Sequence, residues 1–166
     1  WIHSKTTPNR LRLLREYVRN GGALLMFGGY YSFQGINGGA RYHRTPVEEV
    51  LPVSCLSVDD RIEVPEGFAP VVTGKESHPI LKGLGTDWPV LLGYNEVTVK
   101  DGAEVLATVS TEYGSQPLLV TGTYGKGRTV AWTSDVGPHW LPSSFIAWPG
   151  YKTLFEQMLA WATAKA

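Results

Sequence analysis

The sequence has 166 residues, in which 15 lysines and arginines balance 15 aspartates and glutamates. A chain of this length is expected to form one domain with a substantial core, and its zero net charge excludes nucleic acid and an anionic membrane as expected partners. The sequence has one cysteine and four scattered histidines, which predicts a cytoplasmic protein without disulfides, metal sites or cofactors. It has no apolar run of about 20 residues, so no membrane span is expected.

The first predicted element is a helix over residues 8–20. Thr7 suits the N-cap and Pro8 suits the first helical position, where its missing N–H costs nothing. Leucine and valine then recur at helical spacing. Asn20 and the two glycines after it end the helix in a left-handed turn.

Two elements follow in chain order. Residues 23–27, with the sequence ALLMF, are continuously apolar, which predicts a strand covered on both faces, as in a parallel sheet. Thr45 and Glu48 have the spacing of a capping box and begin a short helix that Pro52 ends.

The second half of the chain changes to short β-prone runs, from about residue 61 to residue 133. Segments 118–123 and 128–133, joined by Tyr-Gly-Lys-Gly, are predicted to form a hairpin. The chain closes with a helix over 150–164, because apolar residues recur there on one helical face.

Six short motifs carry a family resemblance, namely YVRNGGALLMFGG, TPVEEVLP, HPILKGL, GKGR, TSDVGPHW and WPGYKTLFEQMLAW. In this order the chain resembles the bacterial putative glutamine amidotransferase family of the class I glutamine amidotransferase-like superfamily. The resemblance implies an α/β fold with a flavodoxin-like sheet, helices on both faces and an added β-rich region. It covers a single domain over residues 1–166.

The resemblance also bears on completeness. A sheet of this class has at least two further strands before the one that leads into the catalytic bend, joined by long crossovers. Only one predicted helix precedes residues 23–27. We therefore expect N-terminal strands to be missing from this chain, which would make it the C-terminal part of a longer polypeptide.

For catalysis, the resemblance implies a Gly-x-Cys-x-Gly turn whose cysteine attacks the glutamine amide, and a later His-x-Glu pair. Matched to that pattern, Tyr30 stands at the cysteine position, and Ser32 stands at the second glycine. His139 matches the histidine, but Leu141 replaces the glutamate, which leaves the histidine without its orienting partner. A phenol with a pKa near 10 is a poor nucleophile. We therefore expect no glutaminase activity.

The candidate binding pocket follows from the topology, because ligands of doubly wound sheets bind beyond the carboxyl ends of the strands. Eight residues follow two such ends: Gly28, Gly29, Tyr30, Tyr31, Ser32, Asp135, His139 and Trp140. Aromatic walls with a hydrogen-bonding aspartate and histidine suit a small molecule. Two plainer interpretations stay open, since the tyrosines can pack a loop and the aspartate can cap a turn.

Three functional classes remain. The first is a noncatalytic amidotransferase-like domain that binds an unknown small molecule or protein. The second is a hydrolase with rearranged chemistry that uses Ser32, Asp135 and His139. The third is a true glutamine amidotransferase, for which Cys55 would have to reach the pocket, although its neighbours PVSCL predict a buried structural thiol.

Overall fold

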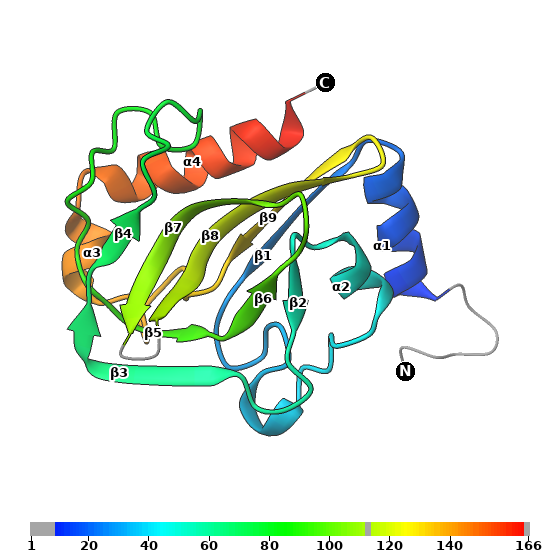
Figure 1. The fold of residues 1–166 in the computed structure, drawn as a ribbon, viewed down its shortest axis with the longest axis horizontal. Coiled ribbons are helices and arrows are strands. Elements are labelled where there is room, and N and C mark those ends of the chain that lie inside the picture. Colours follow the sequence, from blue (N-terminus) through cyan, green and yellow to red (C-terminus); the bar gives the residue numbers. More distant parts are fainter. Residues whose placement is uncertain (1–8, 112–113, 165–166) are drawn as a thin grey trace.

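The computed structural model describes residues 9–111 and 114–164, and a five-stranded sheet lies at its centre (Figure 1). The strand order is β1-β9-β8-β7-β4, with the bounds Ala23–Phe27, Gly127–Trp132, Gly114–Tyr124, Glu104–Thr111 and Pro70–Val72. β1 is parallel to β9, and the other neighbouring strands are antiparallel. The sheet is therefore mixed, and in the described residues the parallel pairing expected of a flavodoxin-like layout is limited to β1 and β9.

Two antiparallel ribbons and four α-helices complete the described part of the chain. One ribbon pairs β2 with β6, Val53–Cys55 with Val97–Val99. The other pairs β3 with β5, Arg61–Phe68 with Leu91–Asn95. The helices are α1 to α4, with a 3-10 turn at Ile36–Gly38, and span Arg10–Arg19, Pro46–Val50, Ser143–Ala147 and Gly150–Thr163.

α1 begins at Arg10, later than predicted, because Asn9 is its N-cap. The Asn9 carboxamide oxygen accepts hydrogen bonds from the backbone N–H groups of Leu11 (3.0 Å) and Arg12 (3.2 Å). The predicted cap at Thr7 and Pro8 lies outside the described residues. The predicted stop is confirmed, with Asn20 at the C-cap and a positive φ at the next glycine.

The start of α2 only partly follows the predicted capping box. The Thr45 hydroxyl accepts a hydrogen bond from the Glu48 N–H at 3.4 Å. The Glu48 carboxylate does not return to Thr45 but accepts a hydrogen bond from the Cys55 N–H at 3.0 Å.

The predicted hairpin is confirmed as β8 and β9, joined by a two-residue turn with Gly125 at φ +61°.

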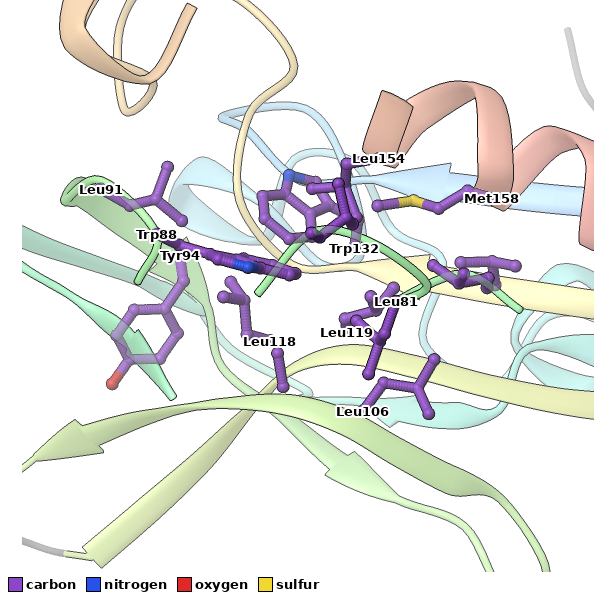
Figure 2. Packing of buried hydrophobic residues seen from close by; sticks show 14 of the residues in the cluster. Leu81, Trp88, Leu91, Tyr94, Leu106, Leu118, Leu119, Trp132, Leu154 and Met158 are labelled. Atoms are coloured by element: carbon purple, nitrogen blue, oxygen red, sulfur yellow. The ribbon is translucent and has the colours of Figure 1, made fainter. Parts of the chain in front are cut away.

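The sheet has a hydrophobic core on each face. On one face α4 packs on the sheet, and Leu154 and Met158 lie against Trp132 (Figure 2). On the other face α1 and α2 cover a second core that includes Val47 and Ala131. The predicted helix at 150–164 is thus confirmed as a core helix.

β1 contributes to both cores and lies at the edge of the described sheet. Leu25 packs into the core under α4, whereas Leu24 and Met26 pack into the core under α1. All five β1 residues are only half-buried. The strand is therefore covered on both faces, as predicted, but one lateral edge has no neighbouring strand among the described residues.

Candidate functional site

β1 leads into a bend at Gly28 and Gly29, where both positions require glycine. The Gly28 N–H donates to the carbonyl oxygen of Trp132 at 2.8 Å, and a Cβ at Gly28 would lie 2.1 Å from the Thr133 carbonyl oxygen. Gly29 has φ +126°, and a Cβ there would lie 2.5 Å from a carboxylate oxygen of Asp135. The two glycines therefore allow the carboxyl ends of β1 and β9 to touch.

Tyr30 follows this bend and is held on three sides. Its hydroxyl donates to a carboxylate oxygen of Glu63 at 2.7 Å, and the Arg61 guanidinium carbon lies 4.8 Å from the ring centroid. The ring makes an edge-to-face contact with the imidazole of His139, with 4.4 Å between the centroids. The hydrogen bond to Glu63 and partial burial raise the pKa of the Tyr30 phenol, which makes it a still weaker nucleophile.

The Arg61 guanidinium is fixed over Tyr30 by Asp59. Two hydrogen bonds join the groups, from Nε at 3.0 Å and from a terminal nitrogen at 2.8 Å. Asp59 also accepts from the Asn37 N–H at 2.7 Å. These contacts, the Arg61 bond first, hold the pKa of Asp59 well below its usual range.

His139 forms a pair with Asp135. Its Nδ1 lies 2.7 Å from a carboxylate oxygen of Asp135, and the same oxygen accepts from the Trp140 N–H at 3.0 Å. His139 has φ +142°, a strained value for a residue with a Cβ. Its side chain is 39% exposed, and Nε2 forms no hydrogen bond within the described residues. This nitrogen is free to donate to or accept from a ligand.

The expectation that His139 lacks an orienting partner was therefore wrong. Asp135 contacts the imidazole, whereas the family pattern has a glutamate two residues after the histidine. Leu141, at that later position, is 1% exposed and packs in the core under α4. The partner comes from four residues upstream because the loop after β9 turns back on itself.

Trp140 forms the buried side of the site. Its ring centroid lies 5.9 Å from that of Tyr30 and 5.3 Å from that of His139. The indole lies directly against Gly93, where a Cβ would come within 2.5 Å of the indole nitrogen. Glycine on β5 is thus what allows the indole to pack below Tyr30 and His139.

Tyr31 and Ser32 are not brought into this group of contacts. Tyr31 is 76% exposed. The Ser32 N–H donates to the Gly29 carbonyl oxygen at 3.4 Å, and among the described residues the Ser32 hydroxyl forms no hydrogen bond with His139. The remaining residues predicted for the pocket lie together. That they bind a ligand stays a prediction.

Sequence reasoning missed Asn95 and Asp60, which hold the bend from below. The buried Asn95 side chain accepts from the Gly29 N–H at 2.8 Å and donates to Asp60 at 2.8 Å. Asp60 also accepts from the N–H groups of Gln34 (2.7 Å) and Gly35 (2.9 Å). Burial raises the pKa of Asp60, against the effect of these hydrogen bonds. The only signal in the sequence is an asparagine that ends the apolar run LLGYN.

Cys55 lies in the core under α1 and α2, away from the contacts of Tyr30. Burial, followed by the nearby carboxylates of Glu48 and Asp60, raises the pKa of its thiol. Reactive thiols have the opposite surroundings, because positive charge or a helix N-terminus lowers their pKa. The chain has no other cysteine, so no thiol is placed to attack an amide at Tyr30.

We define the Tyr30 site by residues that contact one another, namely Gly29, Tyr30, Arg61, Glu63, Asp135, His139 and Trp140. It offers aromatic surface, a guanidinium and one unbonded imidazole nitrogen, which suit stacking and hydrogen bonding. Cavities of about 640 Å³ and 750 Å³ lie elsewhere and are not lined by these residues.

Within the described residues, no group of three or more His, Cys, Asp or Glu side chains could hold a metal ion. None of the described helices is long and apolar enough to cross a membrane.

A family model described as Putative glutamine amidotransferase matches residues 1–164. A solved structure of a cytoplasmic protein from Salmonella typhimurium is 44% identical, with a TM-score of 0.89 over 98% of this chain and 63% of that one. A second cytoplasmic protein, from Salmonella typhimurium LT2, is 43% identical, with a TM-score of 0.88 over 95% of this chain and 62% of that one. The chain thus spans less than two thirds of the length of either protein.

More distant structures share the fold alone. A β-galactosidase from Rahnella sp. R3 is 16% identical and has a TM-score of 0.59 over 90% of this chain and 20% of its own. No curated protein matches the chain.

Proposed function

Since this chain belongs to the putative glutamine amidotransferase family, we propose that it is an amidotransferase-like domain that lacks glutaminase activity and binds a small molecule or a protein at the Tyr30 site. The observation that carries this proposal is the identity of residue 30, a tyrosine, and the hydrogen bond that its hydroxyl forms. A phenol occupies the position that the family pattern gives to the nucleophilic cysteine, and its proton is committed to Glu63. A covalent thioester cannot form there.

The binding role is supported by what surrounds the phenol. His139 keeps an imidazole nitrogen without a hydrogen bond in the described residues, and Arg61 presents a cation over the ring. Groups of this kind at the carboxyl ends of strands bind ligands in open α/β sheets. The bound group would be held by stacking and hydrogen bonds.

A hydrolase remains the second candidate, because the Asp135–His139 pair is the arrangement that activates a nucleophile in hydrolases. It would need Ser32 to reach His139, and this hydrogen bond is not formed among the described residues. We therefore rank it below binding.

We also infer a flavodoxin-like continuation of the sheet beyond β1. Its support is that β1 is wholly apolar and pairs on one side only in the described sheet, whereas edge strands usually carry charges or proline. A crystal structure of the protein with nothing paired to β1 would contradict it.

We infer a cytoplasmic location from the two Salmonella proteins that are named as cytoplasmic.

The function is tested with purified protein in two arms. Incubated with L-glutamine, the protein should release ammonia no faster than buffer alone. Ammonia release that disappears when Cys55 is alkylated would overturn the proposal. In the second arm, small molecules are screened for those that raise Tm. At least one such ligand should lose its effect in Tyr30→Ala and His139→Ala but keep it in Tyr31→Ala, an exposed neighbour that serves as the matched control. If every stabilising ligand keeps its effect in both variants, the binding role is wrong.

A further inference from the structure

The ribbon of β3 and β5 has two faces that carry different chemistry. Arg61 and Glu63 contact Tyr30, whereas Ile62 and Val64 line a cavity of about 640 Å³. This alternation is the ordinary period of a strand, in which successive side chains point to opposite faces. The cavity therefore lies behind the Tyr30 site, on the other side of the same ribbon.

The same alternation holds on β5. Asn95 bonds to the Gly29 bend, whereas its neighbours Tyr94 and Glu96 line the cavity. The opposite wall comes from the β7–β8 hairpin, with Val109 and Gln116. The cavity is thus enclosed by two separate pieces of β structure.

An irregularity in β3 borders this cavity. Glu63 pairs with Gly93 and Phe68 pairs with Leu91, so residues 64–67 lie opposite Leu92 alone. The excursion includes a glycine in the left-handed region, at position 67. Bulged segments of this kind bend a strand, and residues 66–68 of this stretch line the cavity.

The lining combines apolar and polar side chains and carries negative charge. Ile62, Val64, Phe68 and Val109 supply apolar surface, and among the described residues the charged side chains of the lining are two glutamates, Glu66 and Glu96. Neither carboxylate takes part in an ion pair or side-chain hydrogen bond within the described residues. The cavity therefore favours a positive group on an apolar body.

Tyr94 gives an independent indication of a ligand. Its side chain is 3% exposed, and its ring packs edge-on against Phe68 with 5.7 Å between centroids. Its hydroxyl has no hydrogen-bond partner in the described part of the chain. Figure 2 shows this hydroxyl directed away from the core around Trp132 and Leu154. The ring is buried but its hydroxyl, unpartnered within the described residues, lines the cavity, where it is available for a hydrogen bond with a ligand.

We propose that this cavity binds a small organic amine, with a primary ammonium group on an aromatic or aliphatic stem. The ammonium is attracted by the carboxylates that line the cavity, Glu96 beside Tyr94 and Glu66 in the excursion of β3, and donates to the Tyr94 hydroxyl oxygen, while the stem rests on Ile62 and Val64. The volume is in the usual range for small-molecule sites, about 300 to 1,000 Å³. The site differs in place and charge from the Tyr30 site.

Phenethylamine is the probe for this proposal, in calorimetric titrations at low salt. Phenethyl alcohol has the same stem with a hydroxyl in place of the ammonium, and is the matched ligand control. The amine is expected to bind saturably and at least about tenfold more tightly than the alcohol, because only the amine carries a positive charge that the carboxylates attract. The absence of saturable amine binding, or equal binding of the alcohol, would overturn the proposal.

Variants test the residues themselves. Replacing both glutamates, Glu66→Gln with Glu96→Gln, keeps their shape and should weaken amine binding at least about tenfold. Glu76→Gln, at an exposed glutamate outside the cavity, should leave it unchanged. The exposed single variant Glu66→Gln serves if the double variant fails to fold. Tyr30→Ala should bind the amine normally, which separates this inference from the proposed function. Unchanged affinity in the glutamine variants would overturn it.

Discussion

One nitrogen of the His139 imidazole is hydrogen-bonded to the Asp135 carboxylate, and the ring lies edge-to-face with the ring of Tyr30. A histidine held in this way activates a neighbouring hydroxyl or thiol in nucleophilic enzymes. Here the neighbouring group is a phenol that donates to Glu63. At the scale of residues, the loss of amide chemistry that we propose therefore depends on the side chain at position 30, since the histidine–aspartate pair is formed.

This reasoning predicts the behaviour of Tyr30→Cys in a Cys55→Ala background. The new thiol would lie beside His139, and ion-pair formation with the imidazolium lowers the pKa of a thiol. We expect alkylation by iodoacetamide at pH 6 to be at least about tenfold faster than for a free cysteine, whose pKa is about 8.5. Adding His139→Ala should restore the ordinary pH profile. A thiol that titrates near 8.5 with His139 present would contradict the prediction.

At the scale of elements, the bend after β1 depends on polar groups that come from other parts of the chain. Asp60, just before β3, and Asn95, at the end of β5, together satisfy backbone N–H groups of Gly29, Gln34 and Gly35. The segment from Gly29 to Gly35 has no regular secondary structure of its own. Two buried side chains from other parts of the chain therefore hold the backbone at both ends of this segment.

We expect Asp60→Ala to lower the free energy of unfolding by about 2–3 kcal/mol, because it removes the acceptor of two buried backbone N–H groups and one of the two acceptors of the Asn95 amide nitrogen. The loss is moderated because burial of the carboxylate itself is unfavourable, as the raised pKa of Asp60 shows. Urea denaturation measures the difference. Asp87→Ala, at an exposed aspartate, should stay within about 0.5 kcal/mol of the parent. Equal effects of the two substitutions would contradict this account of the bend.

The elements that the sequence predicted best are those defined by local periodicity. The helix at 150–164 and the hairpin around Gly125 are confirmed because spacing and turn residues determine them. The start of α1 was misplaced because two capping residues lie close together, and Asn9 is used. The hydrogen bond between Gly29 and Asn95 joins residues 66 positions apart, and no local pattern encodes such a pairing.

At the scale of the whole molecule, Trp161 of α4 joins three parts of the fold. Arg128 of β9 donates to its carbonyl oxygen at 2.8 Å and lies over its ring at 5.2 Å. His78, from the segment between β4 and β5, packs on the same ring with 5.4 Å between centroids. The His78 Nδ1 accepts a hydrogen bond from the Ile80 N–H at 3.2 Å, which requires this nitrogen to be unprotonated.

Burial lowers the pKa of His78, so global stability should depend on pH. The unfolded chain, with a histidine pKa near 6.5, takes up the proton first as pH falls. The stability that neutral His78 contributes to the free energy of unfolding is therefore fully present above the unfolded-state pKa. It is lost as pH falls from the unfolded-state pKa towards the lower pKa of the folded protein. We expect urea midpoints to decrease between pH 7.5 and pH 5.5. In His78→Asn, which can still accept from Ile80, this decrease should be smaller. An identical slope in the variant would contradict the assignment.

The two-faced ribbon of β3 and β5 also bears on how this chain tolerates changes in length. Inserting or deleting one residue in 61–63 or 93–96 would exchange the faces, turning the partners of Tyr30 towards the cavity and the cavity lining towards Tyr30. In the excursion at 64–67, which is opposite Leu92 alone, an added residue enlarges a loop that is already unpaired. Natural length variation within this ribbon should therefore be confined to the excursion, where it would change the size of the cavity and leave the bend at Tyr30 in place.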